Sequence, residues 1–214
     1  MEGMEKIDRC VIIGASPDTD VNFLRQAVRA EDYVICADGG AAFARAAGLR
    51  VDLTVGDFDS GDVPADTPVE QYPPEKDYTD LELAVKRSVE RGFRRILILG
   101  GTGGRFVHTL MNVMLMFRCA RYGIEVTLED AQMLAYAMTE PEKASRIPPN
   151  RTYSVFSIGG DSIVSEIGAK YPLDHHTLPG FNAIGVSGVS NFSQDGAEVI
   201  LHQGNLLIVI EKNI

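Results

Sequence analysis

The sequence predicts two domains: an α/β domain over residues 1–140 with a mostly parallel, Rossmann-like three-layer sheet, and a small all-β, sandwich-like domain over residues 141–214. In the first part, short apolar runs alternate with helical patterns, which is typical of a parallel sheet covered by helices on both faces. In the second part, short β-type runs are separated by turns, and no long helical pattern occurs. The polar, proline-containing segment at 139–150 is expected to connect the two domains.

The elements of the first domain are expected to alternate between strands and helices. The expected strands are 9–14, 32–37, 51–56, 94–100 and 124–130, and the expected helices are 19–29, 39–48, 79–92 and 110–123. The helix at 79–92 has the clearest start, because Thr79 and Glu82 have the spacing of a capping box. Leu81 and Val85 would then lie on one face of this helix.

The second domain is expected to consist of antiparallel strands. Its apolar runs are at 152–159, 161–168, 197–204 and 205–212. Turn residues separate these runs at the spacing of antiparallel strands. The segment "DHH" at 174–176 lies between the runs and is expected to be a loop, whereas His202 is expected to be a structural residue of a strand.

The bulk composition excludes several classes of protein. The formal net charge is −10 and the pI is about 4.8, and no basic stripe suited to nucleic acid is present. No apolar run approaches the roughly 20 residues that cross a bilayer, and the start of the chain has no signal-peptide pattern. Cys10, Cys36 and Cys119 are scattered, so we expect reduced, buried thiols in a cytoplasmic protein.

Four polar stretches follow predicted strands or open predicted helices. They are "ADGGA" with Asp38 and Gly39, "GDFDS" with Asp57 and Asp59, "EKDYTD" with Lys76, Asp77, Thr79 and Asp80, and "GGTGGRFVH" with Gly103, Gly104, Arg105 and His108. Ligands bind beyond the carboxyl ends of parallel strands, so these stretches are expected to meet at one edge of the sheet. Each one alone also fits a turn or a helix start, and the glycine-rich loop matches neither the dinucleotide-binding nor the P-loop pattern. His108 fits a role in the site and a helix-capping role equally well.

The charges of these stretches indicate a metal ion and a polyphosphate. Asp57 and Asp59 point the same way in extended backbone, so their carboxylates repel each other unless a cation lies between them. Together with Asp80 they offer the hard oxygen ligands that Mg²⁺ prefers. Lys76 and Arg105 supply cations for phosphate groups, and the glycine-rich loop supplies backbone amides. These are the components that phosphoryl transfer requires.

Six short motifs occur in a fixed order along nearly the whole chain. They are "ADGGA", "GDFDS", "KDYTDLELAV", "GGTGGRFVHTLMN", "GAKYPL" and "GVSN". This series closely resembles the motifs of the thiamine pyrophosphokinase (thiamine diphosphokinase) family. The resemblance implies an α/β nucleotide-binding domain, a β-sandwich-like domain, and a homodimer with thiamine bound in a cleft between subunits. The implied reaction transfers the diphosphoryl group of ATP to the thiamine hydroxyl and gives thiamine diphosphate and AMP.

The resemblance also implies roles for individual residues. The Mg²⁺ ligands would be Asp57, Asp59 and Asp80, and the catalytic residues would be these three and Arg105. The residues of the ATP site would be Asp38, Gly39, Lys76, Asp77, Thr79, Gly103, Gly104, Arg105 and His108. The thiamine pocket would be formed with the help of Tyr171, Ser190 and Asn191.

Two positions depart from the pattern of the family. Val107 stands where the family usually has aspartate in its glycine-rich motif, and Phe192 stands where relatives often have glutamate. Neither side chain can ligate a metal or accept a hydrogen bond. Three possibilities stay open: a slow enzyme, a different alcohol as substrate, or another carboxylate that substitutes. Two alternatives therefore accompany the leading hypothesis: a catalytically weak protein that binds thiamine or thiamine diphosphate, and a pyrophosphokinase for a related alcohol.

Overall fold

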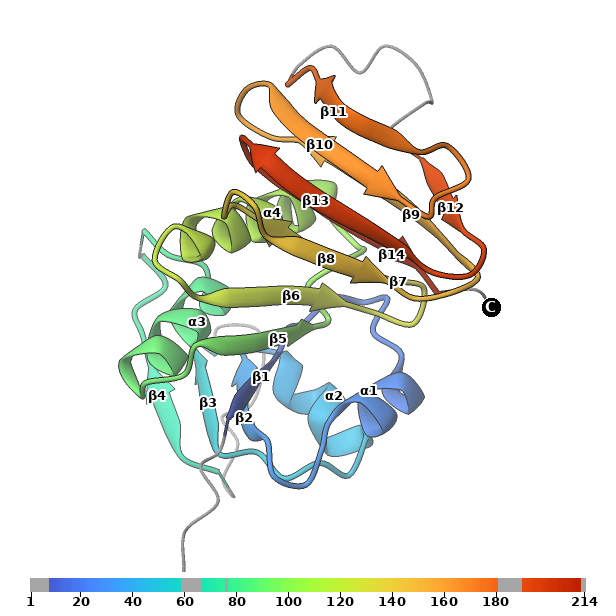
Figure 1. The fold of residues 1–214 in the computed structure, drawn as a ribbon. Coiled ribbons are helices and arrows are strands. Elements are labelled where there is room, and N and C mark those ends of the chain that lie inside the picture. Colours follow the sequence, from blue (N-terminus) through green and yellow to red (C-terminus); the bar gives the residue numbers. More distant parts are fainter. Residues whose placement is uncertain (1–7, 59–66, 76, 181–189, 213–214) are drawn as a thin grey trace, which may run out of the picture. The chain divides into compact units, whose positions relative to one another are not determined.

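A computed structural model of the chain describes residues 8–58, 67–75, 77–180 and 190–212. The chain divides into two compact units, Met1–Ala131 and Gln132–Ile214, the second of which is coloured yellow to red in Figure 1. The division comes before strand β7 (Met133–Met138), which the sequence prediction placed in the first domain. The expected connector at 139–150 contains a strand, β8 (Ala144–Ile147), so it belongs to the second unit.

The first unit contains a sheet in which each strand pairs with its neighbour in parallel. Its strands are β1 (Arg9–Ile13), β2 (Tyr33–Ala37), β3 (Leu53–Gly56), β4 (Val69–Gln71), β5 (Arg95–Leu99) and β6 (Glu125–Glu129). Their order is β6-β5-β1-β2-β3-β4. The chain moves outward from β1 to β4 and then returns to the other side of β1. The order therefore reverses between β1 and β5, and such a reversal is where ligands bind in open α/β sheets.

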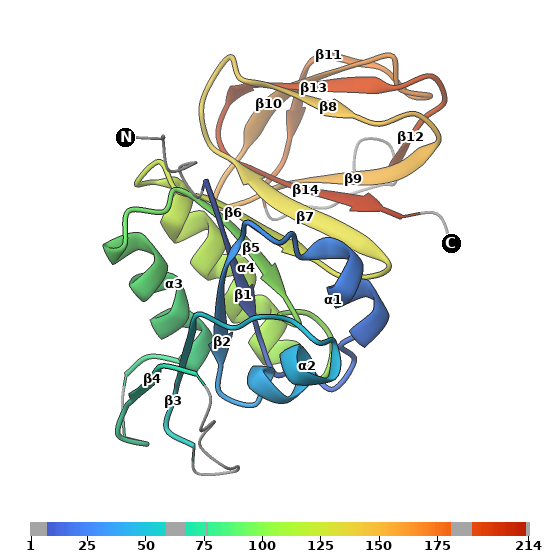
Figure 2. The same cartoon turned by 90° about the horizontal axis from the view of Figure 1, so that it is seen from below.

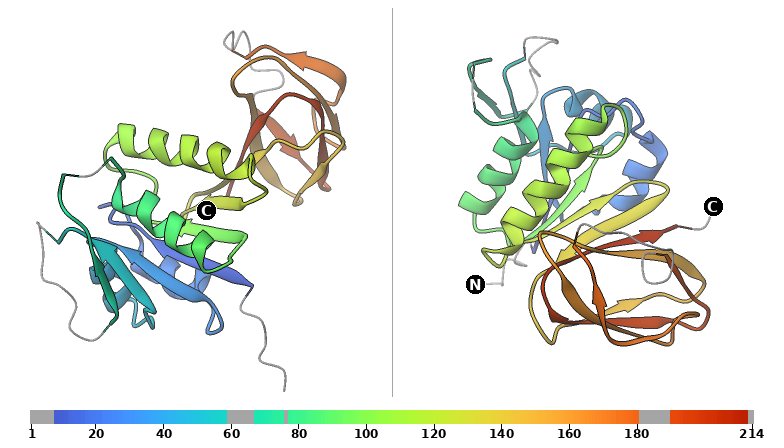
Figure 3. Two further views of the ribbon diagram at one scale, coloured as in Figure 1. Left: turned by 90° about the vertical axis from the view of Figure 1, so that its left-hand side faces the viewer. Right: turned by 90° about the horizontal axis from the view of Figure 1, so that it is seen from above.

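Helices cover both faces of this sheet. They are α1 (Val21–Ala27), α2 (Gly40–Ala46), α3 (Asp80–Glu90) and α4 (Phe106–Ala120). Helices α1 and α2 lie on one face, as Figure 2 shows, and α3 and α4 lie on the other, as Figure 3 shows. Helix α4 starts earlier than the expected residue 110, directly after the glycine-rich loop. Within the described ranges no helix is long and apolar enough to cross a bilayer.

Helix α3 begins where the sequence predicts. The hydroxyl oxygen of Thr79 accepts a hydrogen bond from the amide of Glu82 at 3.2 Å, which confirms Thr79 as the N-cap. The carboxylate of Glu82 pairs with Arg118 of α4. Val85 is buried as predicted, whereas Leu81 is only half-buried, and the buried face also includes Leu83 and Ala84.

The apolar core of the first unit includes a cluster between the sheet and helices α1 and α2. Its buried members are Val11, Ile13, Leu24, Val34, Cys36, Ala44, Ala47, Leu97 and Leu99. All three cysteines of the chain are free and buried, which confirms the prediction of reduced, buried thiols. Burial raises the pKa of the Cys10 and Cys36 thiols to about 12, so neither thiol is a reactive nucleophile at neutral pH.

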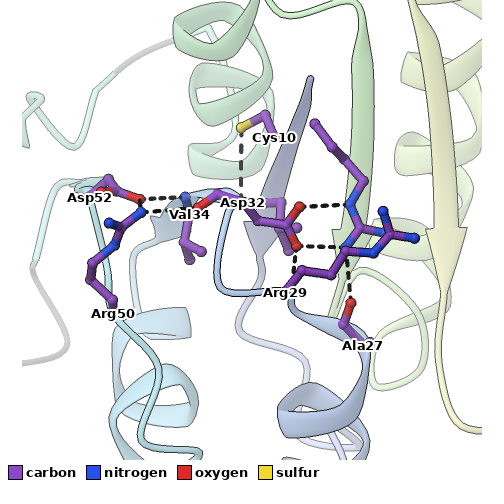
Figure 4. A network of polar contacts seen from close by, with 9 residues as sticks. Cys10, Ala27, Arg29, Asp32, Val34, Arg50 and Asp52 are labelled. Atoms are coloured by element: carbon purple, nitrogen blue, oxygen red, sulfur yellow. Dashed lines mark hydrogen bonds and ion pairs between the residues drawn. The ribbon is translucent and has the colours of Figure 1, made fainter. Parts of the chain in front are cut away.

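A polar network fixes the amino-terminal ends of β1 and β2 (Figure 4). The guanidinium of Arg9 donates to both carboxylate oxygens of Asp32, at 2.9 and 2.6 Å, and the amide of Arg29 donates to the same carboxylate at 2.7 Å. Asp32 is only 3% exposed. A buried charge of this kind needs several partners, and here it has them. This network lies at the end of the sheet opposite to the carboxyl ends of the strands.

The second unit contains two sheets of antiparallel strands. The remaining strands are β9 (Arg151–Ser157), β10 (Ser162–Ile167), β11 (Leu173–Leu178), β12 (Asn191–Ser193), β13 (Ala197–Gln203) and β14 (Leu206–Glu211). The strand orders are β12-β9-β14-β7 and β11-β10-β13-β8. One hydrophobic cluster takes buried side chains from both sheets, including Tyr153 of β9 and Leu201 of β13. The four strands predicted for this unit are β9, β10, β13 and β14.

The prediction of a loop at 174–176 is wrong. These residues belong to β11, an edge strand that pairs only with β10 in its sheet. Most of its side chains are exposed, so it lacks the alternating apolar pattern by which strands are predicted. His175 stacks on His202, with 4.0 Å between the ring centroids, and Nε2 of His202 lies 2.8 Å from the Ser165 hydroxyl. These contacts agree with a structural role for His202.

Candidate functional site

A cavity of about 520 Å³ lies at the carboxyl ends of β1, β2 and β5 in the first unit. One wall is the loop Gly14–Pro17 that follows β1, and the facing wall is the glycine-rich loop after β5. Asp38, the start of α3 and the first turns of α4 complete the lining. The cavity therefore occupies the place where the strand order reverses, which is the expected ligand site of such a sheet.

The floor of the cavity is formed by two glycines in close contact. The amide of Gly14 donates to the carbonyl of Leu99 at 2.7 Å, and the amide of Ser16 donates to the carbonyl of Gly100 at 3.1 Å. A Cβ atom on Gly14 would lie 2.5 Å from the carbonyl oxygen of Gly100. No side chain fits between these two strands' ends, so glycine at both positions keeps the cavity open.

The glycine-rich loop lines the cavity as the sequence predicts. Gly103 and Gly104 have φ angles of 80° and 59°, a left-handed conformation that favours glycine. Arg105 and His108 follow at the start of α4 and also line the cavity. Because α4 begins here, its unsatisfied amides and its dipole favour an anion at this end.

Asn112 is a site residue that the sequence analysis missed. Its side-chain amide is buried and donates to the carbonyl of Gly101 at 2.7 Å, so it ties the loop to α4. Asn112 lies four residues after His108, and both line the cavity together with Met111. Helical spacing from His108 was the signal that could have identified it.

Three of the predicted polar residues meet on the other side of the cavity. Asp38, Thr79 and Asp80 all line it. Asp38 has a φ angle of 43°, and its amide donates to the carbonyl of Val55 at 2.7 Å, which ties the end of β2 to β3. A Cβ atom on Gly56 would lie 3.2 Å from Oδ1 of Asp38, so the side chain of Asp38 lies beside the residue that precedes Asp57. The stretches "ADGGA" and "GDFDS" are therefore neighbours.

Other predicted residues are not part of the cavity lining. Asp57 is half-buried, and its backbone carbonyl accepts a hydrogen bond from the side chain of Gln71 at 3.3 Å. Gly39 and Asp77 are exposed and do not line the cavity. Asp59 and Lys76 lie outside the described residues.

The predicted metal site is therefore seen only in part. Among the residues that the structure describes, no three histidine, cysteine or acidic side chains are grouped as a metal site requires. The carboxylates of Asp38 and Asp80 at the cavity are hard oxygen donors, and such donors suit Mg²⁺.

Val107 lies beside this site on the first turn of α4. Its side chain is 45% exposed and is not part of the cavity lining, whereas the next residue, His108, is. Phe106, Leu110 and Met114 of the same helix are also exposed. The position of the missing aspartate therefore borders a solvent-facing apolar surface.

In the second unit, Asn191 holds the backbone of Tyr171. The side chain of Asn191 is buried, its Oδ1 accepts from the amide of Tyr171 at 3.0 Å, and its Nδ2 donates to the carbonyl of Tyr171 at 2.8 Å. Tyr171 itself is 52% exposed, and Ser190 is half-buried next to Asn191. Asn191 thus orders the loop that presents Tyr171.

The buried carboxylate of Glu166 holds the side chain of Asn191 in place. Oε2 of Glu166 accepts from the Tyr153 hydroxyl at 2.6 Å and from Nδ2 of Asn191 at 2.8 Å. Oε1 of Glu166 has no hydrogen-bond partner among the described residues. Burial raises the pKa of Glu166, while the hydrogen bonds from Tyr153 and Asn191 oppose the rise.

The stability of Glu166→Gln relative to wild type is expected to depend on pH. Because the pKa of Glu166 is raised in the folded state, its protonated side chain contributes fully to the free energy of unfolding below the unfolded pKa of about 4.5. This contribution is lost as the pH rises through the folded pKa. Glutamine cannot lose a proton, so the stability of the variant relative to wild type should rise as the pH increases from about 4.5 through the folded pKa of Glu166. Urea unfolding at several pH values measures this difference. A constant difference across that range would contradict the raised pKa.

A family model for the catalytic domain of thiamin pyrophosphokinase matches residues 24–128. This range contains every predicted residue of the metal and ATP sites, from Asp38 to His108. It does not contain the loop Gly14–Pro17 that forms one wall of the cavity.

Two curated proteins are similar in sequence over part of the chain. Thiamin pyrophosphokinase 1 of Caenorhabditis elegans is 30% identical over 156 residues, which are 66% of this chain and 63% of that protein. Thiamine pyrophosphokinase of Bacillus subtilis (strain 168) is 34% identical over 111 residues, which are 50% of this chain and 52% of that protein. The matched part of the chain thus spans less than two thirds of the length of either relative.

A solved structure is similar over nearly the whole chain. The crystal structure of thiamine pyrophosphokinase from Bacillus subtilis aligns with a TM-score of 0.83 and 24% identity, over 97% of this chain and 100% of that chain. This likeness shows that the fold is shared. The family model, the curated relatives and the shared fold agree with the motif series: residues 24–128 are similar to the catalytic domain of thiamin pyrophosphokinase, and nearly the whole chain has the fold of such a protein.

Proposed function

We propose that the protein is an ATP-dependent thiamine diphosphokinase that uses Mg²⁺. The cavity where the strand order reverses carries this proposal, because it combines a glycine-rich loop and a helix start with Arg105, Asp38 and Asp80. Amides, the helix dipole and Arg105 favour a polyphosphate, while the carboxylates favour a divalent cation. In the proposed reaction the thiamine hydroxyl oxygen attacks the β-phosphorus of ATP, the bond from that phosphorus to the leaving oxygen breaks, and AMP departs.

The residues of the first unit would hold the nucleotide. The loop at Gly103 and Gly104, with Arg105 and Lys76, would bind and orient the phosphate groups. The remaining residues of the proposed ATP site are Asp38, Gly39, Asp77, Thr79 and His108. Asp57, Asp59 and Asp80 would hold Mg²⁺, which when bound supplies positive charge that neutralises the transferring phosphates.

The residues of the second unit would bind thiamine. Tyr171 presents an exposed aromatic ring, Asn191 orders its backbone, and Ser190 is adjacent. In this proposal the first unit is a Rossmann-like catalytic domain, and the second is a sandwich-like thiamine-binding domain. We also propose a cytoplasmic homodimer. The exposed apolar side chains of Phe106, Leu110 and Met114 on α4 suit a subunit interface.

The formation of AMP and thiamine diphosphate from ATP, Mg²⁺ and thiamine tests the proposal. We expect the two products in equal amounts, and neither product when thiamine is omitted. AMP or ADP formation that does not depend on thiamine would contradict the assignment. A panel of other alcohols, run beside thiamine, checks the choice of substrate.

Val107→Asp is expected to increase turnover. The new carboxylate would restore the acid that the resemblance implies at this position, on the first turn of α4 next to the cavity-lining His108. A group that accepts the proton of the attacking hydroxyl contributes typically about 10²–10⁴ in rate. We expect a gain of about tenfold or more in kcat. Val107→Asn has a similar size and no charge, and it should show no gain. A kcat of Val107→Asp equal to that of wild type would contradict this role.

A further inference from the structure

The two walls of the cavity are joined by one hydrogen bond between side chain and backbone. Oδ2 of Asp18, in the loop after β1, accepts from the amide of Gly104 in the glycine-rich loop at 2.7 Å. This bond joins the loop after β1 to the glycine-rich loop, beside the cavity-lining residues Pro17 and Gly103. We call this contact between Asp18 and Gly104 the clasp.

Both loops are shaped to make the clasp. A Cβ atom on Gly103 would lie 3.0 Å from Cβ of Asp18, and one on Gly104 would lie 2.9 Å from Cδ of Pro17. The glycine-rich loop therefore approaches residues 17 and 18 more closely than any larger residue allows.

The loop that carries Asp18 is itself held in a tight turn. The hydroxyl of Thr19 donates to the carbonyl of Ser16 at 2.7 Å, and the amide of Asp18 donates to the hydroxyl of Ser16 at 3.3 Å. These bonds fix the backbone on both sides of Asp18. The carboxylate is therefore presented to Gly104 by an ordered turn rather than by a free loop.

The opposite side of the glycine-rich loop is anchored by α4. Asn112 holds the carbonyl of Gly101, and the hydroxyl of Thr109 donates to the carbonyl of Gly103 at 3.4 Å. The start of the loop is also held by Ser16, whose amide donates to Gly100, and by Thr102, whose hydroxyl donates to Asp130 at 2.6 Å. Without Asp18, the tip of the loop at Gly103 and Gly104 would be fixed from α4, through Thr109. Asp18 supplies the second anchor, and a charge-assisted bond from a carboxylate to an amide is the stronger kind of hydrogen bond.

We propose that Asp18 is a positioning residue for the nucleotide: it fixes the glycine-rich loop before ATP binds. The inference rests on the proposed function, since it concerns the same cavity. The amide of Gly104 is occupied by the clasp, so the loop offers its other amides and Arg105 to the phosphates. Loss of the clasp leaves the loop to be ordered by the nucleotide, and this ordering reduces affinity for ATP.

The experiment compares Asp18→Ala with Asp18→Asn. Asparagine keeps an oxygen that accepts from Gly104, whereas alanine does not. We expect Asp18→Ala to raise both the KM for ATP and the Kd for ATP measured without thiamine by about five- to tenfold, as loss of a typical hydrogen bond does. The KM for thiamine should not change, and Asp18→Asn should recover most of the affinity for ATP.

A second readout needs no ligand. Hydrogen exchange of the Gly104 amide, measured by NMR on the ligand-free protein, should be about tenfold faster in Asp18→Ala than in wild type. Glu31→Ala is the matched control, since it removes one exposed carboxylate from the turn before β2, at the opposite end of the sheet. That control should leave both the ATP affinity and the exchange of Gly104 unchanged.

Two results would contradict the proposed positioning role of Asp18. Unchanged ATP affinity and exchange in Asp18→Ala would show that the contact positions nothing. Tighter ATP binding in Asp18→Ala would show that the carboxylate competes with phosphate instead. A wild-type protein that forms no thiamine diphosphate would contradict the proposed function alone, because hydrogen exchange and ATP titration still decide the role of Asp18.

Discussion

Asp57→Ala is expected to lower the rate of thiamine diphosphate formation by about 10²–10⁴. Asp57 follows β3 directly after Gly56, the residue beside Asp38, and it is a proposed Mg²⁺ ligand together with Asp80. A bound metal ion supplies several kcal/mol of charge stabilisation in the transition state, and each 1.36 kcal/mol corresponds to a factor of ten in rate. Steady-state assays over a range of Mg²⁺ concentrations measure the loss.

A direct measurement of metal binding separates this role from a structural one. Titration of Mn²⁺ in the presence of ATP should show weaker binding to Asp57→Ala than to wild type. Asp57→Asn keeps the size of the side chain and should lose activity as well, because the amide is neutral. If Asp57→Ala keeps its Mn²⁺ affinity and a third or more of the wild-type rate, Asp57 is not a ligand.

Gly40→Ala is expected to destabilise the protein by about 3–5 kcal/mol or to prevent folding. Gly40 is the first residue of α2, and a Cβ atom there would overlap the carbonyl oxygen of Ile13 and lie 2.8 Å from its carbonyl carbon. Both groups belong to backbone at the buried end of β1, which cannot move aside. Urea unfolding, or the soluble yield where unfolding cannot be measured, tests this expectation.

The adjacent residue provides the control for Gly40. A Cβ atom on Gly39 would lie 3.3 Å from Cβ of Ala15 and meet no backbone atom. The φ angle of Gly39 is −57°, which alanine adopts readily. We expect Gly39→Ala to change the unfolding free energy by about 1 kcal/mol or less. Equal effects of the two substitutions would show that the packing of α2 on β1 is not the cause.

The arrangement of the first unit could be predicted from the sequence because its signals are local. Apolar runs predicted the strands β1, β2, β3, β5 and β6, and the stretches "ADGGA", "EKDYTD" and "GGTGGRFVH" supplied part of the cavity lining. Strand β4 escaped prediction, because Val69–Gln71 is short and partly polar. The neighbouring strand β3 could be predicted, since all of its residues are buried.

The wall of the cavity after β1 could not be predicted in the same way. The segment "SPDTD" has the composition of a turn, and its local bonds are those of a turn. The contact that gives Asp18 its place is with Gly104, 86 residues later in the chain. Asp18 and Gly104 come together because β1 and β5 pair in parallel. A periodic pattern within one segment cannot predict such a contact.

The residues of the second unit show a similar limit. Asn191 was predicted from a motif as a substrate ligand, and its side chain is engaged with Glu166 and the backbone of Tyr171. The resemblance groups Tyr171 with Asn191, and the two residues are in contact although 20 residues separate them. The resemblance did not indicate the buried Glu166, because no motif contains this residue. Glu166 of β10 accepts a hydrogen bond from Tyr153 of β9, and this contact arises only when the two strands pack together.

Because every cysteine is buried, the native protein is expected to react little with thiol-labelling reagents. Alkylating reagents attack thiolates, and the thiols of Cys10, Cys36 and Cys119 are shielded, with pKa values raised by burial. A cysteine placed at Phe106, which is 78% exposed at the start of α4, would be readily alkylated in a single subunit and covered in the proposed homodimer. The rate of its alkylation would therefore report the dissociation of the dimer directly.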